Sequence, residues 1–311
     1  MSKWTTAEIP DQTGRTVLIT GANSGLGLES ARTMAAKGAK VLVACRNPER
    51  GTAARQQVAA VAHTDPELVE LDLADLSSVR AAASRVRETT GDELDVLMNN
   101  AGVMATPRRS TRDGFELQIG TNHLGHAALT WLLMPALRQR PGARVVTLSS
   151  IAHRGGGLDV DDLNFERRRY TPTRAYAQSK LANLLFTLEL DRAARRAGLD
   201  LVSAAAHPGM AGTELVGNMT RHRPLPEVVH RGIEALTGAF TQSSAQGALP
   251  QLHAATAPGV AGGHYYGPDG FREIRGYPKR ASRIPAAQDE QTARRLWAVT
   301  AELTGITPDP R

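Results

Sequence analysis

A glycine-rich turn between an apolar run and a helical stretch constrains the fold of this chain most. Residues 16–20 are apolar or β-branched, the turn reads Gly21-Ala22-Asn23-Ser24-Gly25-Leu26-Gly27, and residues 28–36 favour a helix. Glycines allow a tight turn and let backbone N–H groups approach a pyrophosphate, whose charge the helix N-terminus favours. The spacing G-x-x-x-G-x-G in a strand–turn–helix context therefore predicts a dinucleotide site on a parallel α/β sheet.

The residue after the next apolar run bears on the type of dinucleotide. Residues 40–45 predict the neighbouring strand, and Arg46 follows directly. An acidic residue at this place suits the ribose 2′-hydroxyl of NAD, whereas an arginine suits a 2′-phosphate. Arg46 therefore favours NADP(H) over NAD(H), and the alternative interpretation is a solvated arginine at a strand end.

Short apolar runs alternate with helical stretches along the whole chain, with no internal repeat and no low-complexity linker. Strands are expected near 16–20, 40–45, 67–71, 96–99, 143–149, 200–206 and 263–267. A last helix is expected near 286–304, with Leu296, Val299 and Leu303 on one apolar stripe. This alternation predicts a doubly wound parallel sheet of the Rossmann type in a single domain over residues 1–311.

Tyr176 and Lys180 are four residues apart in a helical stretch and so share one face of the helix. A tyrosine normally ionises near pH 10, and an adjacent cation favours the phenolate. The pair is therefore a candidate acid/base for an alcohol or ketone. The alternative is an exposed, solvated pair of no chemical consequence.

Several motifs that follow one another along the sequence are typical of one protein family. They are residues 20–27 around the glycine turn, Asp72, Asn99-Asn100-Ala101-Gly102, Asn122, Ser150, and the Tyr176/Lys180 pair. With these motifs the chain resembles the short-chain dehydrogenases/reductases over nearly its whole length. The stretches 121–126, 149–153, 161–164, 178–186 and 207–209 resemble the retinol-dehydrogenase-like branch more narrowly.

The resemblance implies four catalytic residues. Tyr176 would be the general acid/base, and Ser150 would hydrogen-bond the substrate oxygen. Lys180 would hold the nicotinamide ribose and lower the pKa of Tyr176, while Asn122 would position a water in a proton relay. Ser149 is the neighbouring candidate for the role of Ser150, which is preferred because it directly precedes the apolar Ile151.

The resemblance also implies a set of cofactor-binding residues, in which Asp72 would contact adenine and residues 208–213 would flank the nicotinamide. The full set is Gly21, Asn23, Ser24, Gly25, Leu26, Gly27, Arg46, Asp72, Leu73, Asn100, Ala101, Gly102, Tyr176, Lys180, Pro208, Gly209 and Thr213.

Two segments are expected to border the substrate. Residues 152–173 form a loop inserted between Ser150 and Tyr176, and residues 209–240 read as an apolar lid. The expected pocket residues are Met104, His153, Met210 and Leu215. Because an apolar pocket disfavours an unpaired charge, we expect a bulky apolar carbonyl or alcohol rather than a small acid or a sugar.

Composition narrows the remaining partner classes. The chain of 311 residues has a net charge of +6, but its arginines are scattered and aromatics are only 4% of residues, so we expect no nucleic-acid partner. The run Arg167-Arg168-Arg169 is expected to be solvated. The lone Cys45 is expected to be a buried, inert thiol, and no H-E-x-x-H pattern occurs, so no metal site is expected.

No apolar run approaches the ~18 residues of a membrane span, and no signal peptide is recognisable. We therefore expect no membrane span and a cytoplasmic location. The helix expected over about 173–197 carries one polar stripe and two apolar stripes, and only one of the apolar stripes is needed to cover the sheet. The second predicts a possible homodimer or, alternatively, an internal contact with the C-terminal helix.

Together these features predict an NADP(H)-dependent oxidoreductase that transfers hydride between the nicotinamide and a carbonyl or alcohol carbon of a lipophilic small molecule. Two alternatives stay open: a non-catalytic dinucleotide-binding regulatory module, and an NAD-preferring dehydrogenase of the same fold. The sequence identifies neither the substrate nor the direction of the reaction.

Overall fold

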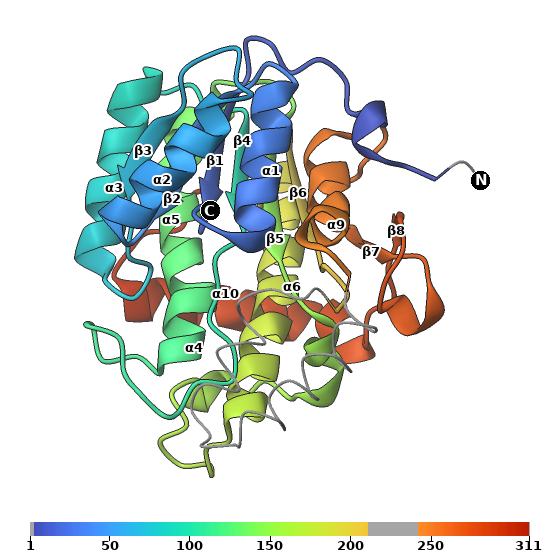
Figure 1. The fold of residues 1–311 in the computed structure, drawn as a ribbon. Coiled ribbons are helices and arrows are strands. Elements are labelled where there is room, and N and C mark those ends of the chain that lie inside the picture. The colour runs from blue at the N-terminus through green and yellow to red at the C-terminus, as the bar shows by residue number, and fades with distance from the viewer. Residues whose placement is uncertain (1–2, 211–241, 311) are drawn as a thin grey trace, which may run out of the picture.

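The computed structural model describes residues 3–210 and 242–310 and is built around one eight-stranded sheet with helices on both faces (Figure 1). The strand order is β3-β2-β1-β4-β5-β6-β7-β8. The strands are β1 Thr16–Thr20, β2 Lys40–Cys45, β3 Glu67–Glu70, β4 Val96–Asn99, β5 Ala143–Leu148, β6 Leu201–Ala206, β7 Tyr265–Pro268 and β8 Pro278–Arg280. The doubly wound α/β fold predicted from the sequence is confirmed.

All neighbouring strands are parallel except β7 and β8, which are antiparallel. Strand β8 has no counterpart among the strands expected from the sequence. Its three residues, Pro278, Lys279 and Arg280, are half-buried or exposed and show no apolar run. They form a strand because the chain turns back after β7 and pairs with the sheet edge, which is a tertiary contact rather than a local preference.

The described helices are α1 Gly25–Ala36, α2 Pro48–Ala59, α3 Leu76–Thr90, α4 Leu117–Ile119, α5 Gly125–Arg138, α6 Pro172–Arg196, α9 Ser244–Thr256 and α10 Glu290–Thr304. Local chemistry sets several boundaries. Asn47 and Thr171 cap α2 and α6 through their side chains, and a proline follows each cap. Gly91 and Gly305 end α3 and α10 in the left-handed conformation.

The strands bury alternate residues on opposite faces of the sheet. Leu18, Leu42 and Leu97 face the side covered by α3 and α5. Val17, Val41 and Val96, one position away, face the side covered by α1, α2 and α9. In Figure 1, α1 and α9 lie side by side on that face. Burial on both faces explains why these strands read as continuous apolar runs.

The C-terminal helix α10 packs on α6 and covers its second apolar stripe. Phe186 of α6 stacks on Trp297 of α10, with ring centroids 5.5 Å apart and planes at 22°. Leu184 and Leu185 belong to the same cluster as Leu296. The internal contact is therefore what the structure shows, and this stripe no longer argues for a homodimer. Helix α10 begins at Glu290 rather than 286, because residues 285–288 form a 3-10 turn and Asp289 caps the helix.

The loop at 152–173 is held by contacts of its own. It contains the 3-10 turns η3 Ile151–Gly155 and η4 Val160–Asp162. The Asp162 carboxylate accepts backbone N–H groups from Glu166, Arg167 and Arg168. The Arg168 guanidinium lies 3.0 Å from Asp162 and stacks over the Phe165 ring. The expectation that all three arginines of this run are solvated is therefore wrong for Arg168.

In the two described ranges, no helix combines the length and the apolar character that a membrane span requires.

Candidate active site

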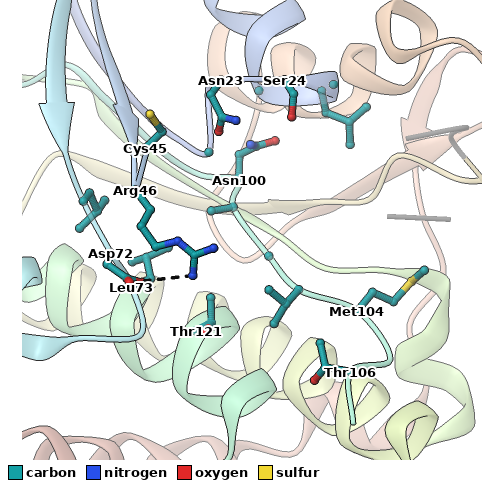
Figure 2. A pocket seen from close by; sticks show the side chains of 18 residues that line it. Asn23, Ser24, Cys45, Arg46, Asp72, Leu73, Asn100, Met104, Thr106 and Thr121 are labelled. Atoms are coloured by element: carbon teal, nitrogen blue, oxygen red, sulfur yellow. Dashed lines mark ion pairs between the residues drawn. The ribbon is translucent and has the colours of Figure 1, made fainter. Parts of the chain in front are cut away.

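A cleft of about 320 Å³ lies at the carboxyl ends of β1, β2, β3 and β4 (Figure 2). Strand order reverses between β1 and β4, which is where open α/β sheets bind their ligands. The cleft brings together these predicted residues: Gly21, Asn23, Ser24, Gly25, Leu26, Gly27, Arg46, Asp72, Leu73, Asn100, Ala101, Gly102 and Met104. The cleft is also lined by five residues that were not expected there, Cys45, Leu71, Val103, Thr106 and Thr121.

The glycine turn leaves room that a side chain would fill. Gly21 and Gly25 have φ angles of +65° and +53°, which favour glycine. A Cβ at Gly27 would overlap the Gly21 carbonyl oxygen and lie 2.6 Å from Asn100 Nδ2. Ser24 is the N-cap of α1, and its hydroxyl makes no capping hydrogen bond to a described amide. The turn therefore fits a pyrophosphate held by backbone N–H groups at a helix N-terminus.

Thr20, the first residue of the 20–27 motif, was given no role of its own and ties β1 to β4 below this turn. Its hydroxyl oxygen accepts the N–H groups of Asn100 and Ala101, both at 2.9 Å. The Asn100 side-chain amide in turn donates to the Thr20 carbonyl oxygen at 2.7 Å. These bonds fix the floor of the cleft. A threonine at the end of an apolar strand was the one sequence signal for this role.

Arg46 and Asp72 lie at one end of the cleft, and Figure 2 shows the Arg46 side chain reaching toward Asp72. Arg46 Nη1 is 3.9 Å from Asp72 Oδ2, and the Arg46 side chain is 74% exposed. The Asp72 Oδ1 atom accepts the Ala74 N–H at 2.9 Å, which orients the carboxylate. Arg46 is thus a solvent-accessible cation, only loosely paired, next to the site predicted for the ribose.

Cys45, the last residue of β2, is buried as expected although it lines the cleft. Burial raises the pKa of its thiol, which donates a hydrogen bond to the Asn47 carbonyl oxygen at 3.2 Å. In the described part of the chain, no three His, Cys, Asp or Glu side chains are grouped to hold a metal ion.

Tyr176, Ser150 and Lys180 converge from β5 and α6. Ser150 follows β5 and caps η3, while Tyr176 and Lys180 are one turn apart on α6. Burial raises the pKa of Tyr176 to about 12, and a hydrogen bond with the Ser150 hydroxyl opposes the rise. Burial also lowers the pKa of Lys180 to about 8. The expected lowering of the Tyr176 pKa by Lys180 is therefore not found, because desolvation dominates.

The structure distinguishes the two neighbouring serines. The Ser149 hydroxyl is buried and donates to the Lys180 carbonyl oxygen at 2.8 Å. Ser150 is only half-buried, and its hydroxyl interacts with the phenol of Tyr176 and lowers the pKa of that phenol. Ser150 is thus the serine positioned to share a substrate oxygen with Tyr176, and Ser149 is a structural residue beneath it.

Asn122 lies in a π-helical turn, η2 Gly120–Leu124, between α4 and α5. Its side-chain amide donates to Ser179 Oγ at 2.9 Å, and Ser179 donates to the Tyr176 carbonyl oxygen at 2.8 Å. The Asn122 backbone carbonyl accepts a hydrogen bond from His126 Nδ1 at 3.0 Å. The π turn therefore anchors Asn122 to the helix that carries Tyr176.

Gly102 is where the cleft and the catalytic candidates meet. A Cβ on this cleft residue would lie 3.2 Å from Asn122 Oδ1 and 3.5 Å from Lys180 Nζ. Asn122 and Lys180 are otherwise buried, so this glycine keeps their polar atoms next to the cleft. A dinucleotide laid along the cleft from Arg46 would end beside Tyr176 and Lys180.

The substrate-pocket predictions fare differently from one another. Met104 lines the cleft. His153 does not face it: the side chain is buried behind Ser150, and its Nδ1 donates to the Ser150 carbonyl oxygen at 2.6 Å. Its expected place in the pocket wall is therefore wrong. Met210 is 41% exposed and is not among the cleft-lining residues.

The nicotinamide-side predictions fall partly outside the described residues. Pro208 and Gly209 follow β6 and do not line the cleft. Thr213, Leu215 and the rest of the expected lid, apart from residues 209 and 210, lie outside the described residues.

Comparison with known proteins places the chain in a family. The family model described as short chain dehydrogenase matches residues 15–224. The chain belongs to the short-chain dehydrogenase family. As a member it is an oxidoreductase that uses a nicotinamide dinucleotide, and the resemblance stated from the motifs is confirmed.

Several relatives of this short-chain dehydrogenase are similar over nearly the whole chain. Human retinol dehydrogenase 13 is 39% identical over 298 residues, which cover 94% of this chain and 85% of the relative. Mouse retinol dehydrogenase 12 is 42% identical over 305 residues, which cover 97% and 89%. The crystal structure of an uncharacterized protein from Mycobacterium paratuberculosis is 43% identical, with a TM-score of 0.81 and 98% of each chain covered.

Proposed function

We propose that this short-chain dehydrogenase is NADP(H)-dependent and transfers hydride between the nicotinamide and a carbonyl or alcohol carbon of a lipophilic small molecule. The observation that carries the proposal is the close approach of Asn122 Oδ1 and Lys180 Nζ to Gly102, which lines the cleft. It joins the cleft that begins at Arg46 to the polar atoms of Asn122 and Lys180.

The chain's own residues supply binding and proton transfer. The bound nicotinamide supplies or accepts the hydride. In the reducing direction Ser150 donates a hydrogen bond to the carbonyl oxygen and Tyr176 delivers the proton to it. In the oxidising direction Tyr176 takes that proton back. At neutral pH the Tyr176 phenol holds the proton that it donates, and burial, which raises its pKa, opposes the loss of that proton.

Lys180 and Asn122 support Tyr176 in this mechanism. Lys180 Nζ donates to the Leu148 carbonyl oxygen at 3.1 Å, and Asn183 donates to the same oxygen at 2.9 Å. The ammonium therefore has further N–H donors for the ribose hydroxyls of the cofactor. Asn122 holds the turn of α6 that presents Tyr176, through Ser179.

The preference for NADP(H) rests on Arg46. A guanidinium that is 74% exposed, with a carboxylate no closer than 3.9 Å, is available to a 2′-phosphate. The alternative is an NAD-preferring enzyme in which Arg46 stays paired to Asp72 and takes no part in binding the cofactor. The two alternatives differ in which partner Arg46 takes when cofactor binds.

The substrate class rests on the apolar wall of the cleft and on the relatives. Val103 and Met104 line the cleft next to Gly102, and Thr106 is the polar residue beside Met104 (Figure 2). An apolar wall disfavours small charged acids, which would lose hydration there without a partner. Retinol, the substrate in the relatives' names, is a long apolar alcohol and agrees with this class.

A non-catalytic dinucleotide-binding module is the second candidate. The fully assembled set of Ser150, Tyr176 and Lys180 argues against it, because binding alone requires no proton donor. Turnover distinguishes the two candidates directly.

The deciding experiment has two stages. Calorimetric titration with NADPH and NADH comes first, and tighter binding of NADPH is expected. Turnover is then measured with lipophilic ketones, aldehydes, retinoids and steroids beside sugars and short hydroxy acids. Tighter NADH binding would overturn the cofactor proposal. Turnover of sugars or hydroxy acids alone would overturn the substrate proposal, and cofactor binding without any turnover would favour the binding module.

A further inference from the structure

A buried carboxylate outside the four catalytic candidates lies behind the active site. Glu273 ends the short turn η5 Phe271–Glu273, and its side chain is 8% exposed. Its Oε2 atom lies 2.5 Å from Arg154 Nη2 and 3.2 Å from His207 Nε2. Its Oε1 atom accepts the Ser282 N–H at 3.0 Å. One carboxylate thus meets two side chains that lie 53 positions apart in the sequence.

A hydrogen bond of His207 defines the tautomer of its imidazole ring. His207 Nδ1 accepts the Gly209 N–H at 3.2 Å, so the ring proton of the neutral form is on Nε2. Burial lowers the pKa of His207, although Glu273 opposes this, so the neutral form prevails at neutral pH. Nε2, which carries the ring proton, lies 3.2 Å from the Glu273 carboxylate but makes no aligned hydrogen bond within the described residues, so the two side chains are in close contact without a hydrogen bond.

The two partners of Glu273 belong to two site-forming segments. Arg154 lies in η3, the turn that begins at the Ser150 cap. His207 is the first residue of the turn 207–209, which follows β6 and contains Pro208 and Gly209. The carboxylate therefore connects the turn that carries Ser150 with the turn predicted to flank the nicotinamide.

The backbone around Glu273 is held against its own preference. Arg272 and Glu273 have φ angles of +50° and +61°, a left-handed conformation that residues other than glycine rarely adopt. The next residue, Ile274, accepts the Met210 N–H at 2.7 Å. A Cβ at Gly209 would overlap the Ile274 carbonyl oxygen. Such strained positions persist where the surroundings fix them, and they gather at functional sites.

From this arrangement we infer that Glu273 is a positioning residue for hydride transfer. It fixes the Ser150 turn through Arg154 and the 207–209 turn through His207. The substrate oxygen and the nicotinamide ring are thereby kept in register. This inference rests on the proposed function for its kinetic consequence. The coupling of the two turns is a property of the protein itself and can be measured without a substrate.

The first test compares Glu273→Gln with a matched control, Glu189→Gln. Glu189 is also a buried carboxylate paired with arginines, Arg192 and Arg196, but it lies near the far end of α6. We expect Glu273→Gln to lower kcat roughly 10- to 100-fold, the scale of a lost alignment, with little change in NADPH affinity. Glu189→Gln should lower stability and leave kcat unchanged. Equal kcat losses in the two variants, or none in Glu273→Gln, would overturn the inference.

The second test is hydrogen exchange of the substrate-free protein, which does not depend on turnover. In Glu273→Gln, the amides of residues 151–155 and of Gly209 should exchange faster, while those of β1 and α1 should not. In Glu189→Gln these two turns should keep wild-type protection. Unchanged protection of both turns in Glu273→Gln would overturn the coupling. If both turns exchange faster in Glu273→Gln while the wild-type protein turns over no substrate, only the proposed function is refuted.

Arg154→Met serves if Glu273→Gln fails to fold, because the Arg154 side chain is 35% exposed and its removal leaves the Glu273–His207 contact in place. The same kcat loss is expected, with faster exchange confined to residues 151–155. A folded Arg154→Met protein with wild-type kcat and wild-type exchange would overturn the role of the Glu273–Arg154 link.

Discussion

Lys180 Nζ lies 5.7 Å from the centroid of the Tyr176 ring. The ammonium lies over the ring face, and within the described residues it donates its hydrogen bond to the Leu148 carbonyl oxygen instead of the phenol. Burial acts on the two groups in opposite directions and keeps each nearer its neutral form. At neutral pH Tyr176 is therefore protonated, and it lies beside a lysine whose pKa of about 8 is close to physiological pH.

Replacing Tyr176 by Phe should abolish proton transfer while sparing the glycine turn. We expect turnover to fall by roughly 100- to 10,000-fold, the usual contribution of a general acid, with NADPH affinity nearly intact. Steady-state kinetics and titration measure the two quantities. Tyr266→Phe is the control, because that tyrosine is buried on the sheet face covered by α9. A Tyr176→Phe enzyme with half of wild-type activity would contradict the assignment.

Lys180 should make stability depend on pH. Its pKa is lowered from 10.5 to about 8, so between these values the unfolded chain binds more protons than the folded one. The free energy of unfolding should therefore rise with pH in this window. Relative to Lys180→Met, the wild type should gain on the order of 2 kcal/mol between pH 7.5 and 9.5. Denaturant unfolding of both proteins at the two pH values measures this, and a constant difference between them would count against a buried Lys180.

Arg46→Asp should reverse the cofactor preference. The exchange removes the cation available to a 2′-phosphate and supplies a carboxylate for a ribose hydroxyl. A charge-assisted hydrogen bond contributes about 1.5 to 3 kcal/mol, so NADPH affinity should fall by at least about tenfold. Arg55→Asp on the exposed side of α2 makes the same charge change away from the cleft and should leave the preference intact. Equal losses of NADPH affinity in both variants would show that the affinity depends on the net charge of the protein and not on Arg46.

Gly27→Ala should damage both the cleft and the fold. The added methyl would overlap the Gly21 carbonyl oxygen, which is backbone and cannot rotate away. Such overpacking typically costs about 1 to 3 kcal/mol of unfolding free energy. NADPH affinity should fall with it, because the turn that receives the pyrophosphate must shift. Gly157→Ala, where nothing lies within 4 Å of the new methyl, should change neither thermal stability nor NADPH affinity. Wild-type affinity in Gly27→Ala would remove this turn from the binding site.

Residues that act through local chemistry were readable from the sequence. The roles of Gly21, Gly25 and Gly27 could be predicted because only glycine readily allows positive φ angles and a close approach of the backbone. Most of the parallel strands from β1 to β7 follow from apolar runs buried on both faces, whereas β3, with Glu67 and Glu70 at its ends, is only partly buried. The cleft could be predicted as well, since residues that follow parallel strands gather at one edge of the sheet. The positions of Arg46, Asp72 and Asn100 directly after predicted parallel strands were therefore enough to predict that they lie close together.

Tertiary structure decided what depends on burial and on distant partners. The sequence placed Lys180 near Tyr176 but not the desolvation that reverses the expected shift in the tyrosine pKa. It placed His153 in a pocket wall, whereas packing buries the ring behind Ser150. The short strand β8 and the Glu273–Arg154 contact have no local signal, because each depends on segments that meet only after the sheet has formed. Desolvation and long-range pairing are sums over the whole fold, so no local pattern records them.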